Sequence, residues 1–565
     1  MKKIYLIILI VIANNIYSSK IQAQSLPVGT IGIEDYYRRK QLLGEIDSTI
    51  SFSIRPLFPN ISTNTRNIYD PDSTLNSNSY FSWSGAIPFA PRKGVFQILP
   101  IVWQQQYNSH HPYGWNDGAM IPARGYQTTV SAGLFVKFGP LSIQLRPEII
   151  YAQNKSFEGF AQGKSDDDLT NYYILNNLID NPERFGTGSY KKVLWGQSNI
   201  RLTFGPVSIG LSNENIWWGP GMRNSIMMTN NAPGFKHITL NTVKPVKTGI
   251  GSFEAQIIAG RLAASGASPL NGALTSTGQD LFQPFRDDWR YLTGFNINYQ
   301  PKWVPGLFVG FIRDFMSYHN DNSGLSDYLP YFSSVQKAGN LEGDPISRDQ
   351  RLALYARWLF QKAHAEIYFE YGLNDNSYNY RDFLGSPDHG RSYIFGFNKL
   401  IRLQNTKEQF IEINAEVTQM SQSVDRLVRS AGGFYQHYQV RQGYTNLGQV
   451  LGAGIGSGGN IQSLNVSWRH ALKSFGIGYE RFEHMVDLSD FAFPDINGNS
   501  RRWVDFALSL NGQYDYKNFI FSAKIQGIKS LNYQWRLNGY SPDQYYIPNN
   551  DVFNLHGELG VTFRF

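Results

Sequence analysis

Apolar and polar side chains alternate one by one along much of this chain, and this alternation limits what it can fold into. Between residues 351 and 360 the even-numbered positions are all apolar, whereas Arg351 and Arg357 occupy odd-numbered positions. Successive side chains of a strand point to opposite faces, so this segment predicts a strand with one apolar and one polar face. Roughly 16 to 20 such segments predict an all-β protein. Clear examples are residues 365–371, 411–417, 519–526 and 555–565.

The lengths of the apolar runs exclude one class of membrane protein. After residue 23 no run approaches the roughly 18 consecutive apolar residues that a membrane-spanning helix requires. Two architectures can use many two-faced strands. One is a soluble sandwich, barrel or propeller with apolar faces inward, and the other is a membrane barrel with apolar faces outward.

The first 23 residues have the pattern of a secretory signal peptide. Lys2 and Lys3 precede an apolar run from Ile4 to Ala13 that is too short to cross a bilayer, and we expect cleavage after Ala23. Removal of residues 1–23 lowers the formal charge from 51 − 44 = +7 to 7 − 3 = +4, because three lysines and no acid are lost. A charge this small argues against a nucleic-acid partner.

Composition and the C-terminus favour the membrane barrel. The 565 residues include 37 Phe, 34 Tyr and 12 Trp, which would supply the aromatic girdles at the two membrane interfaces. The last alternating segment ends on Phe565, a candidate assembly signal for the barrel-assembly machinery, and outer-membrane lipid would surround the wall. An ordinary closing strand of a secreted β protein is the alternative.

The absence of cysteine excludes disulfides, thiolate metal sites and a cysteine nucleophile.

One early segment breaks the alternation. Residues 33–44 begin with acids, continue with bases and end on Gly44, which predicts a short helix. We expect residues 24–50 to form a helical plug on the periplasmic side of an outer-membrane barrel built from residues 51–565. An ordinary N-terminal helix with a solvated basic face fits the pattern equally well. Polar, Gly- and Pro-rich stretches predict long extracellular loops over residues 56–80, 153–190, 317–350, 372–388, 483–502 and 528–550.

The most distinctive run of the sequence lies over residues 213–235. It contains a Trp-Trp-Gly-Pro-Gly element at 217–221 and an Asn-Asn-Ala-Pro-Gly-Phe stretch at 230–235. This block resembles the Wzi family of capsule-assembly outer-membrane proteins, and residues 35–44, 113–148 and 443–459 extend the resemblance. The residues of this family signature are Asn213, Glu214, Trp217, Trp218, Gly219, Pro220, Gly221, Asn230, Asn231 and Pro233.

The resemblance implies a fold and a function. It implies an outer-membrane barrel of about eighteen strands with a helical periplasmic plug. It also implies lectin-like binding that holds exported capsular polysaccharide or exopolysaccharide at the cell surface. It supplies no individual sugar-binding residues.

Trp217 and Trp218 would point to opposite sides of a strand, so only one of them could face a lumen or ligand. In a purely structural account, Gly219–Gly221 forms a turn and the two asparagines satisfy backbone groups.

A second aromatic and polar cluster has the punctuation of a loop. We interpret His111, Tyr113, Trp115, Asn116 and Asp117 as a surface patch for glycan, because rings offer flat platforms and the neighbouring polar groups can fix hydroxyls. A metal site fits less well, since adjacent histidines rarely chelate one ion and no third ligand has a diagnostic spacing. We expect neither a metal nor another cofactor.

Enzyme motifs are weak. Residues 454–459 match a dinucleotide fingerprint, but an alternating segment follows where a helix is required. We expect no enzyme, and we keep a porin-like channel and a membrane-embedded hydrolase as alternatives to the lectin.

The polar strand faces carry both signs of charge, which predicts a paired network that braces the lumen or lines a pore. These residues are Arg351, Arg357, Glu366, Glu370, Glu412, Glu416, Arg469 and Glu558.

Overall fold

The protein is described here from a computed structural model. The described residues are 24–63, 67–72, 75, 86–90, 93–269, 273–332, 348–374, 380–385, 387–404, 408–423, 432–493, 502–536 and 550–565. The signal peptide expected over residues 1–23 lies outside these ranges.

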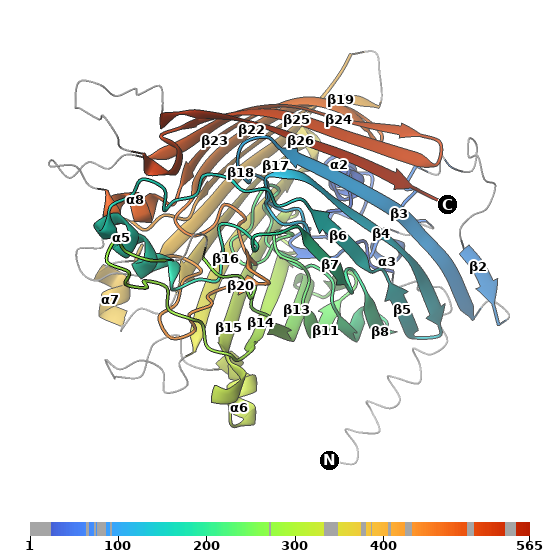
Figure 1. Ribbon diagram of the computed structural model, residues 1–565. Helices are drawn as coiled ribbons and strands as arrows, with labels where there is room; N and C mark the ends of the chain where they lie inside the picture. The colour runs from blue at the N-terminus through green and yellow to red at the C-terminus, as the bar shows by residue number, and fades with distance from the viewer. Residues whose placement is uncertain are drawn as a thin grey trace.

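The strands form a closed antiparallel barrel of 18 strands, as the alternation and the resemblance predict (Figure 1). Each strand pairs with its neighbour in the chain, and the last strand pairs with the first long one to close the ring. The wall consists of β3 (Gly94–Asn108), β4 (Gly125–Phe138), β5 (Leu141–Leu145) with β6 (Glu148–Ala152), β7 (Tyr190–Leu194) with β8 (Asn199–Phe204), β9 (Val207–Ser212), β11 (Lys236–Thr242), β13 (Gly251–Leu262), β14 (Arg290–Pro301), β15 (Leu307–Tyr318), β16 (Asp349–Phe360), β17 (Ala365–Asn374), β18 (Arg391–Arg402), β19 (Gln409–Gln419), β22 (Asn460–His470), β23 (Lys473–His484), β24 (Trp503–Tyr516), β25 (Phe519–Leu531) and β26 (Val552–Phe563). Two short strands, β2 (Ala86–Phe89) and β12 (Val246–Lys247), extend β3 and β13.

The hairpin of β16 and β17 shows how the alternation is used. Phe360 pairs with Ala365 across the turn. Leu354 and Trp358 point outward and are 52% and 40% exposed, whereas Glu366 points inward and is fully buried. The same orientation recurs around the ring, so the apolar faces form the outer surface and the polar faces line the lumen. This is the arrangement of a membrane-spanning barrel.

The two ends of the barrel differ. At one end the strands are joined by short turns such as Gly139–Pro140, Ala471–Leu472 and Lys517–Asn518, and the chain terminates there. At the other end the connections are long and carry α5 (Asp166–Asn176) and α8 (Val486–Ala492) (Figure 1). The long connections also hold α6 (Leu325–Tyr328), α7 (Tyr380–Gly385), η1 (His319–Asp321), η2 (Pro330–Phe332), η4 (Tyr533–Trp535), β20 (Thr445–Asn446) and β21 (Gln449–Val450), whereas η3 (Gln361–Ala363) lies in a short turn.

The N-terminal segment lies inside the barrel at the short-turn end. α2 (Ile33–Leu42) confirms the expected helix; its acids lie in the first turn and its bases in the last, which suits the helix dipole. β1 (Ile54–Arg55) and α3 (Pro59–Ser62) follow within the lumen. The lumen segment therefore continues past residue 50, where the sequence had suggested that the barrel begins, and the first wall strands are β2 and β3.

Long loops pack against one another at the other end. α5 packs on α8, and a cluster of buried side chains from several loops joins them. No helix in the described ranges is long and apolar enough to span a membrane. The cluster consists of Phe160, Leu169, Tyr172, Tyr173, Ala273, Leu488, Phe493 and Trp535.

Candidate functional site

The family signature lies in the lumen, not in the wall. Its two tryptophans form β10 (Trp217–Trp218), which pairs with β1 of the N-terminal segment. The Trp218 ring donates to Gln256 Oε1 of the wall at 2.7 Å, and the Arg55 guanidinium lies 4.2 Å from the Trp217 ring centre. Both rings are buried. The expectation that only one of them could face the lumen is wrong, because the strand that carries them is itself surrounded by the barrel.

Two buried wall carboxylates hold the loop that follows β10. The Glu416 carboxylate of β19 accepts the backbone N–H groups of Met222, Arg223 and Asn224 at 2.8, 2.9 and 2.7 Å. Glu370 of β17 accepts those of Gly221 and Ile226 at 3.0 and 2.9 Å. Five backbone donors of one loop are thus satisfied by two carboxylates, which fixes the loop in the lumen.

The glycines of the signature are required by this close approach. Gly219 has φ +133°, a conformation that other residues rarely adopt. A Cβ atom there would lie 2.3 Å from Glu370 Oε1, and one at Gly221 would lie 1.8 Å from the Asn224 carbonyl oxygen.

The remaining signature residues satisfy buried polar groups, as the structural account predicts. Glu214 is buried and receives the Arg201 guanidinium at 2.9 Å. The Pro220 carbonyl accepts from Arg38 of α2 at 2.8 Å. Backbone carbonyls accept from the side-chain amides of Asn213 (Gly196, 3.2 Å), Asn230 (Asn116, 2.9 Å) and Asn231 (Val450, 2.9 Å), and Pro233 accepts from Asn446 at 3.0 Å.

The lumen charges form the paired network that the sequence predicts. Glu366 contacts Arg357 of the wall at 2.5 Å and Arg38 of α2 at 2.8 Å, so one carboxylate joins the plug to the barrel. Arg469 and Glu412 pair at 2.6 Å. Burial lowers the pKa of Arg38, but the Glu366 carboxylate raises it. The net effect is a pKa above the ordinary value of an arginine.

The expected glycan patch is not on the surface. Tyr113 and Trp115 are 5% and 9% exposed, and their ring centres lie 5.1 Å apart. The loop folds into the lumen because its polar residues bind the signature: the Asn116 amide donates to the Arg223 carbonyl at 2.6 Å, and Arg223 covers the Trp115 ring at 4.9 Å. The surface placement is therefore wrong.

Tyr113, Trp115, Asn116 and Asp117 instead line a chamber of about 340 Å³ within the barrel. Lys524 also lines the chamber, and its amine lies 3.0 Å from the Glu558 carboxylate. Arg223 likewise pairs with Glu480. Each cation of the chamber thus faces a carboxylate, and the amides of Asn414, Asn465 and Asn511 complete the polar lining.

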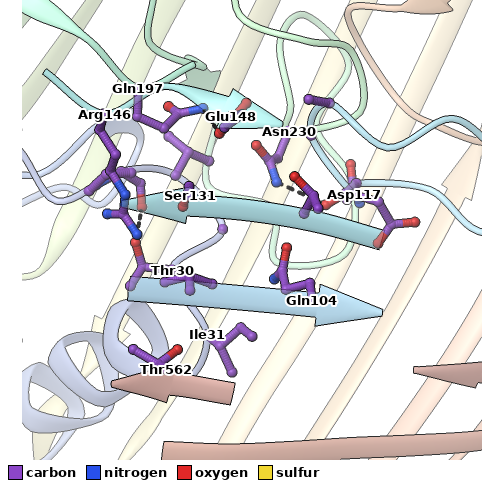
Figure 2. Close-up of a pocket in the computed structure, with 18 residues that line it drawn as sticks. Thr30, Ile31, Gln104, Asp117, Ser131, Arg146, Glu148, Gln197, Asn230 and Thr562 are labelled. Atoms are coloured by element: carbon purple, nitrogen blue, oxygen red, sulfur yellow. Dashed lines mark hydrogen bonds between the residues drawn. The ribbon is translucent and has the colours of Figure 1, made fainter. Parts of the chain in front are cut away.

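A smaller cavity of about 100 Å³ adjoins the other side of Asn116 and Asp117. Figure 2 shows Asp117 and Asn230 at one end of this cavity and Arg146 at the other. Burial raises the pKa of the Asp117 carboxyl, and the nearby Glu558 carboxylate raises it further.

His111 lies apart from this chamber. Its buried ring is 4.8 Å from that of Tyr533, and burial lowers its pKa to about 3.

In the described ranges no group of three or more His, Asp or Glu side chains is placed to hold a metal ion. The dinucleotide-like Gly454–Gly459 stretch leads into β22, so its context is a strand, as expected.

The structure brings together one exposed site that sequence reasoning missed. Tyr173 of α5 meets Phe282 and Phe285 from the β13–β14 connection in a notch of about 30 Å³ at the mouth of the barrel. The α5 region falls in a predicted long loop, but the β13–β14 connection does not. A sequence signal existed in that connection, which is rich in Gly, Ser, Thr and Pro between two alternating segments.

Comparison with known proteins gives a family and a fold. The model of a family described as "Capsule assembly protein Wzi" matches residues 114–482. Among solved structures, the Escherichia coli outer-membrane protein Wzi, a carbohydrate-binding β-barrel involved in group 1 capsule assembly, is similar with a TM-score of 0.61. The match has 11% identity and covers 96% of this chain and 100% of that chain. At this identity the likeness shows the fold alone.

Other matches are weaker. Acinetobacter baumannii OccAB2 matches with a TM-score of 0.39 and 10% identity, covering 82% of this chain and 97% of its own. Pseudomonas aeruginosa OccK11 matches with a TM-score of 0.38 and 9% identity, covering 85% and 98%. No protein with curated annotation matches the sequence significantly.

Proposed function

Because the chain belongs to the family of the capsule assembly protein Wzi, we propose that it is a non-enzymatic lectin that holds exported capsular polysaccharide or exopolysaccharide at the cell surface. The observation that carries this proposal is the family match over more than half of the chain, including the whole signature block. The barrel lies in the outer membrane with its apolar wall toward lipid. Short turns face the periplasm in such barrels, which would put α2 on the periplasmic side and the long loops outside.

The filled lumen argues against the porin-like alternative. α2 and β1 occupy the lumen from the short-turn end, the signature loop is pinned across it, and loops cover the other end. Within the described residues these segments fill the lumen, which favours contact of the polymer with the loops over passage through a pore. Single-channel conductance of the purified protein in planar bilayers would contradict this reasoning.

The histidines give no support to a hydrolase. The rings of His484 and His556 contact the carboxylates of Asp505 and Glu558 at 2.8 and 2.9 Å, and in the part of the chain that the structure describes no serine hydroxyl is bonded to either ring. In a Ser–His hydrolase the serine hydroxyl is activated by a hydrogen bond to the histidine ring.

Two further partners complete the proposal. The outward apolar side chains would contact outer-membrane lipid, and the C-terminal aromatic would be read by the barrel-assembly machinery. Phe565 packs on Phe563 of β26 with ring centres 5.0 Å apart, at the short-turn end where assembly factors have access.

The test of the function is loss of the protein from the cell that makes it. Deletion should leave polysaccharide synthesis intact and shift the polymer from the cell-bound to the shed fraction. Loss of the polymer altogether would contradict an anchoring role. A second measurement, selective binding of the purified protein to polysaccharide extracted from the same cells, with an unrelated polysaccharide as control, tests the contact directly.

A further inference from the structure

The mouth of the barrel carries a preformed notch between two loops that lie about a hundred residues apart in the sequence. One side is α5 with the segment to Glu183, and the other comprises residues 267–269 together with Phe282 and Phe285. Both sides belong to long connections, so the notch lies on the face that the proposed orientation exposes to the outside.

Buried side chains hold the two sides of the notch together. The side-chain amide of Asn177 donates to the Leu281 carbonyl at 2.9 Å, and its oxygen accepts the Gln283 N–H at 3.0 Å. The Asp180 carboxylate accepts both the N–H and the hydroxyl of Ser265, at 2.6 and 2.5 Å. A ligand would thus meet a rigid site, which lowers the entropic cost of binding.

Aromatic rings form the floor and rim. The rings of Tyr172 and Tyr173 stand perpendicular with centres 5.3 Å apart, and those of Phe282 and Phe285 stand perpendicular at 5.6 Å. The two phenylalanines are only half-buried. Tyr172 and Tyr173 are buried, so the accessible rings are those of Phe282 and Phe285, whose faces suit the apolar C–H faces of a sugar ring.

The polar groups of the notch include two carboxylates, which accept hydrogen bonds, and two side-chain amides, which both accept and donate them. One oxygen of the Glu183 carboxylate accepts the Phe160 N–H at 3.0 Å, and within the described residues its other oxygen makes no hydrogen bond. Asn176 and Asn181 lie beside it. Two of the residues that line the notch are acids, and a nearby cation, the Arg441 guanidinium beside the Phe285 ring, already donates to backbone carbonyls of Asn177, Gln283 and Pro284. Such a lining favours hydroxyl donors and disfavours an anionic sugar.

We infer that this notch binds an uncharged saccharide unit of the exported polysaccharide, with the rings of Phe282 and Phe285 against the sugar and Glu183 on its hydroxyls. The inference rests on the proposed function and names the contact through which the polymer is held.

The test uses purified full-length protein in detergent and polysaccharide extracted from the source cells. The polymer is partly hydrolysed and separated by anion exchange into neutral and acidic oligosaccharides. Glu183→Gln keeps an oxygen for the Phe160 N–H and removes the charge, and Phe285→Ala removes part of the rim. Phe491→Ala is the matched control, because Phe491 is an exposed aromatic of α8 outside the notch. Retained heat-modifiable migration on gels verifies the fold of each variant.

We expect the wild-type protein and Phe491→Ala to bind the polymer and its neutral fraction, and the two notch variants to bind roughly tenfold more weakly. Equal binding by all four proteins, or binding of the acidic fraction alone, would overturn the inference and leave the proposed function standing. Failure of the wild-type protein to bind the polymer would remove the proposed function and the inference together.

Discussion

Replacing Glu416 by Gln should release the signature loop from the barrel wall. Glu416 is buried, and its carboxylate accepts three consecutive backbone N–H groups and the Tyr368 hydroxyl, the last at 2.9 Å. Gln has the same shape but only one acceptor oxygen. If that oxygen takes the place of Oε2, it keeps the Met222 and Arg223 donors, and the new NH2 group faces the Asn224 N–H.

The size of the effect follows from these contacts. A hydrogen bond to a charged group contributes about 1.5–3 kcal/mol and one between neutral groups about 0.5–1.5 kcal/mol. The substitution loses the charged bond from the Asn224 N–H and weakens the three bonds from Met222, Arg223 and the Tyr368 hydroxyl, which then end on a neutral oxygen. We therefore expect the loop to be destabilised by about 2–4 kcal/mol.

Hydrogen exchange measures this loss where it occurs. If the three amides exchange by local opening of the loop, their exchange should accelerate roughly 30- to 1,000-fold, since each 1.4 kcal/mol is a factor of ten. Glu408→Gln is the control, because Glu408 is 80% exposed and remote from the loop. Unchanged protection of the 222–224 amides in Glu416→Gln would refute the argument that this carboxylate pins the loop.

Three further perturbations test other parts of the structure. Arg357→Ala leaves Glu366 buried with Arg38 as its remaining cation. The free energy of unfolding in denaturant should therefore fall by about 3–5 kcal/mol. Lys247→Ala breaks an exposed pair with Asp47 and should lower it by less than about 1 kcal/mol. Equal losses would contradict the role of burial. Burial lowers the pKa of His111 from 6.5 to about 3, so the unfolded chain binds a proton that the folded protein does not; its contribution to stability is complete above about pH 6.5 and declines as the pH falls toward 3. His111→Phe should therefore flatten the decline of the melting temperature below pH 6.5, and an unaltered pH profile would exclude this assignment. Deleting Phe565 should lower the amount of protein in the outer-membrane fraction, because the terminal aromatic is proposed as the assembly signal; normal amounts would undo that proposal.

Local patterns were sufficient for the wall and the plug helix. The β16–β17 hairpin was readable because a period of two decides which side chains share a face, whatever the strands pair with. The helix at Ile33–Leu42 was readable because acids, bases and a terminal glycine mark its two ends. The network around Glu366 was foreseeable in kind, since buried charges of both signs have to pair, but its link to Arg38 of the plug was not.

The loops depended on contacts that no local pattern contains. Trp217 and Trp218 are both in the lumen because β10 pairs with β1, about 160 residues away. Tyr113 and Trp115 are buried because their loop binds the Arg223 region. The notch at the mouth exists only where Asn177 meets Leu281 and Gln283. The sequence by itself thus determined the two-faced strands of the wall and the N-terminal helix, because strand and helix periodicity are properties of neighbouring residues. The tertiary structure alone decided which loops turn inward and which side chains form sites, because loop backbones are set by distant partners that satisfy their polar groups.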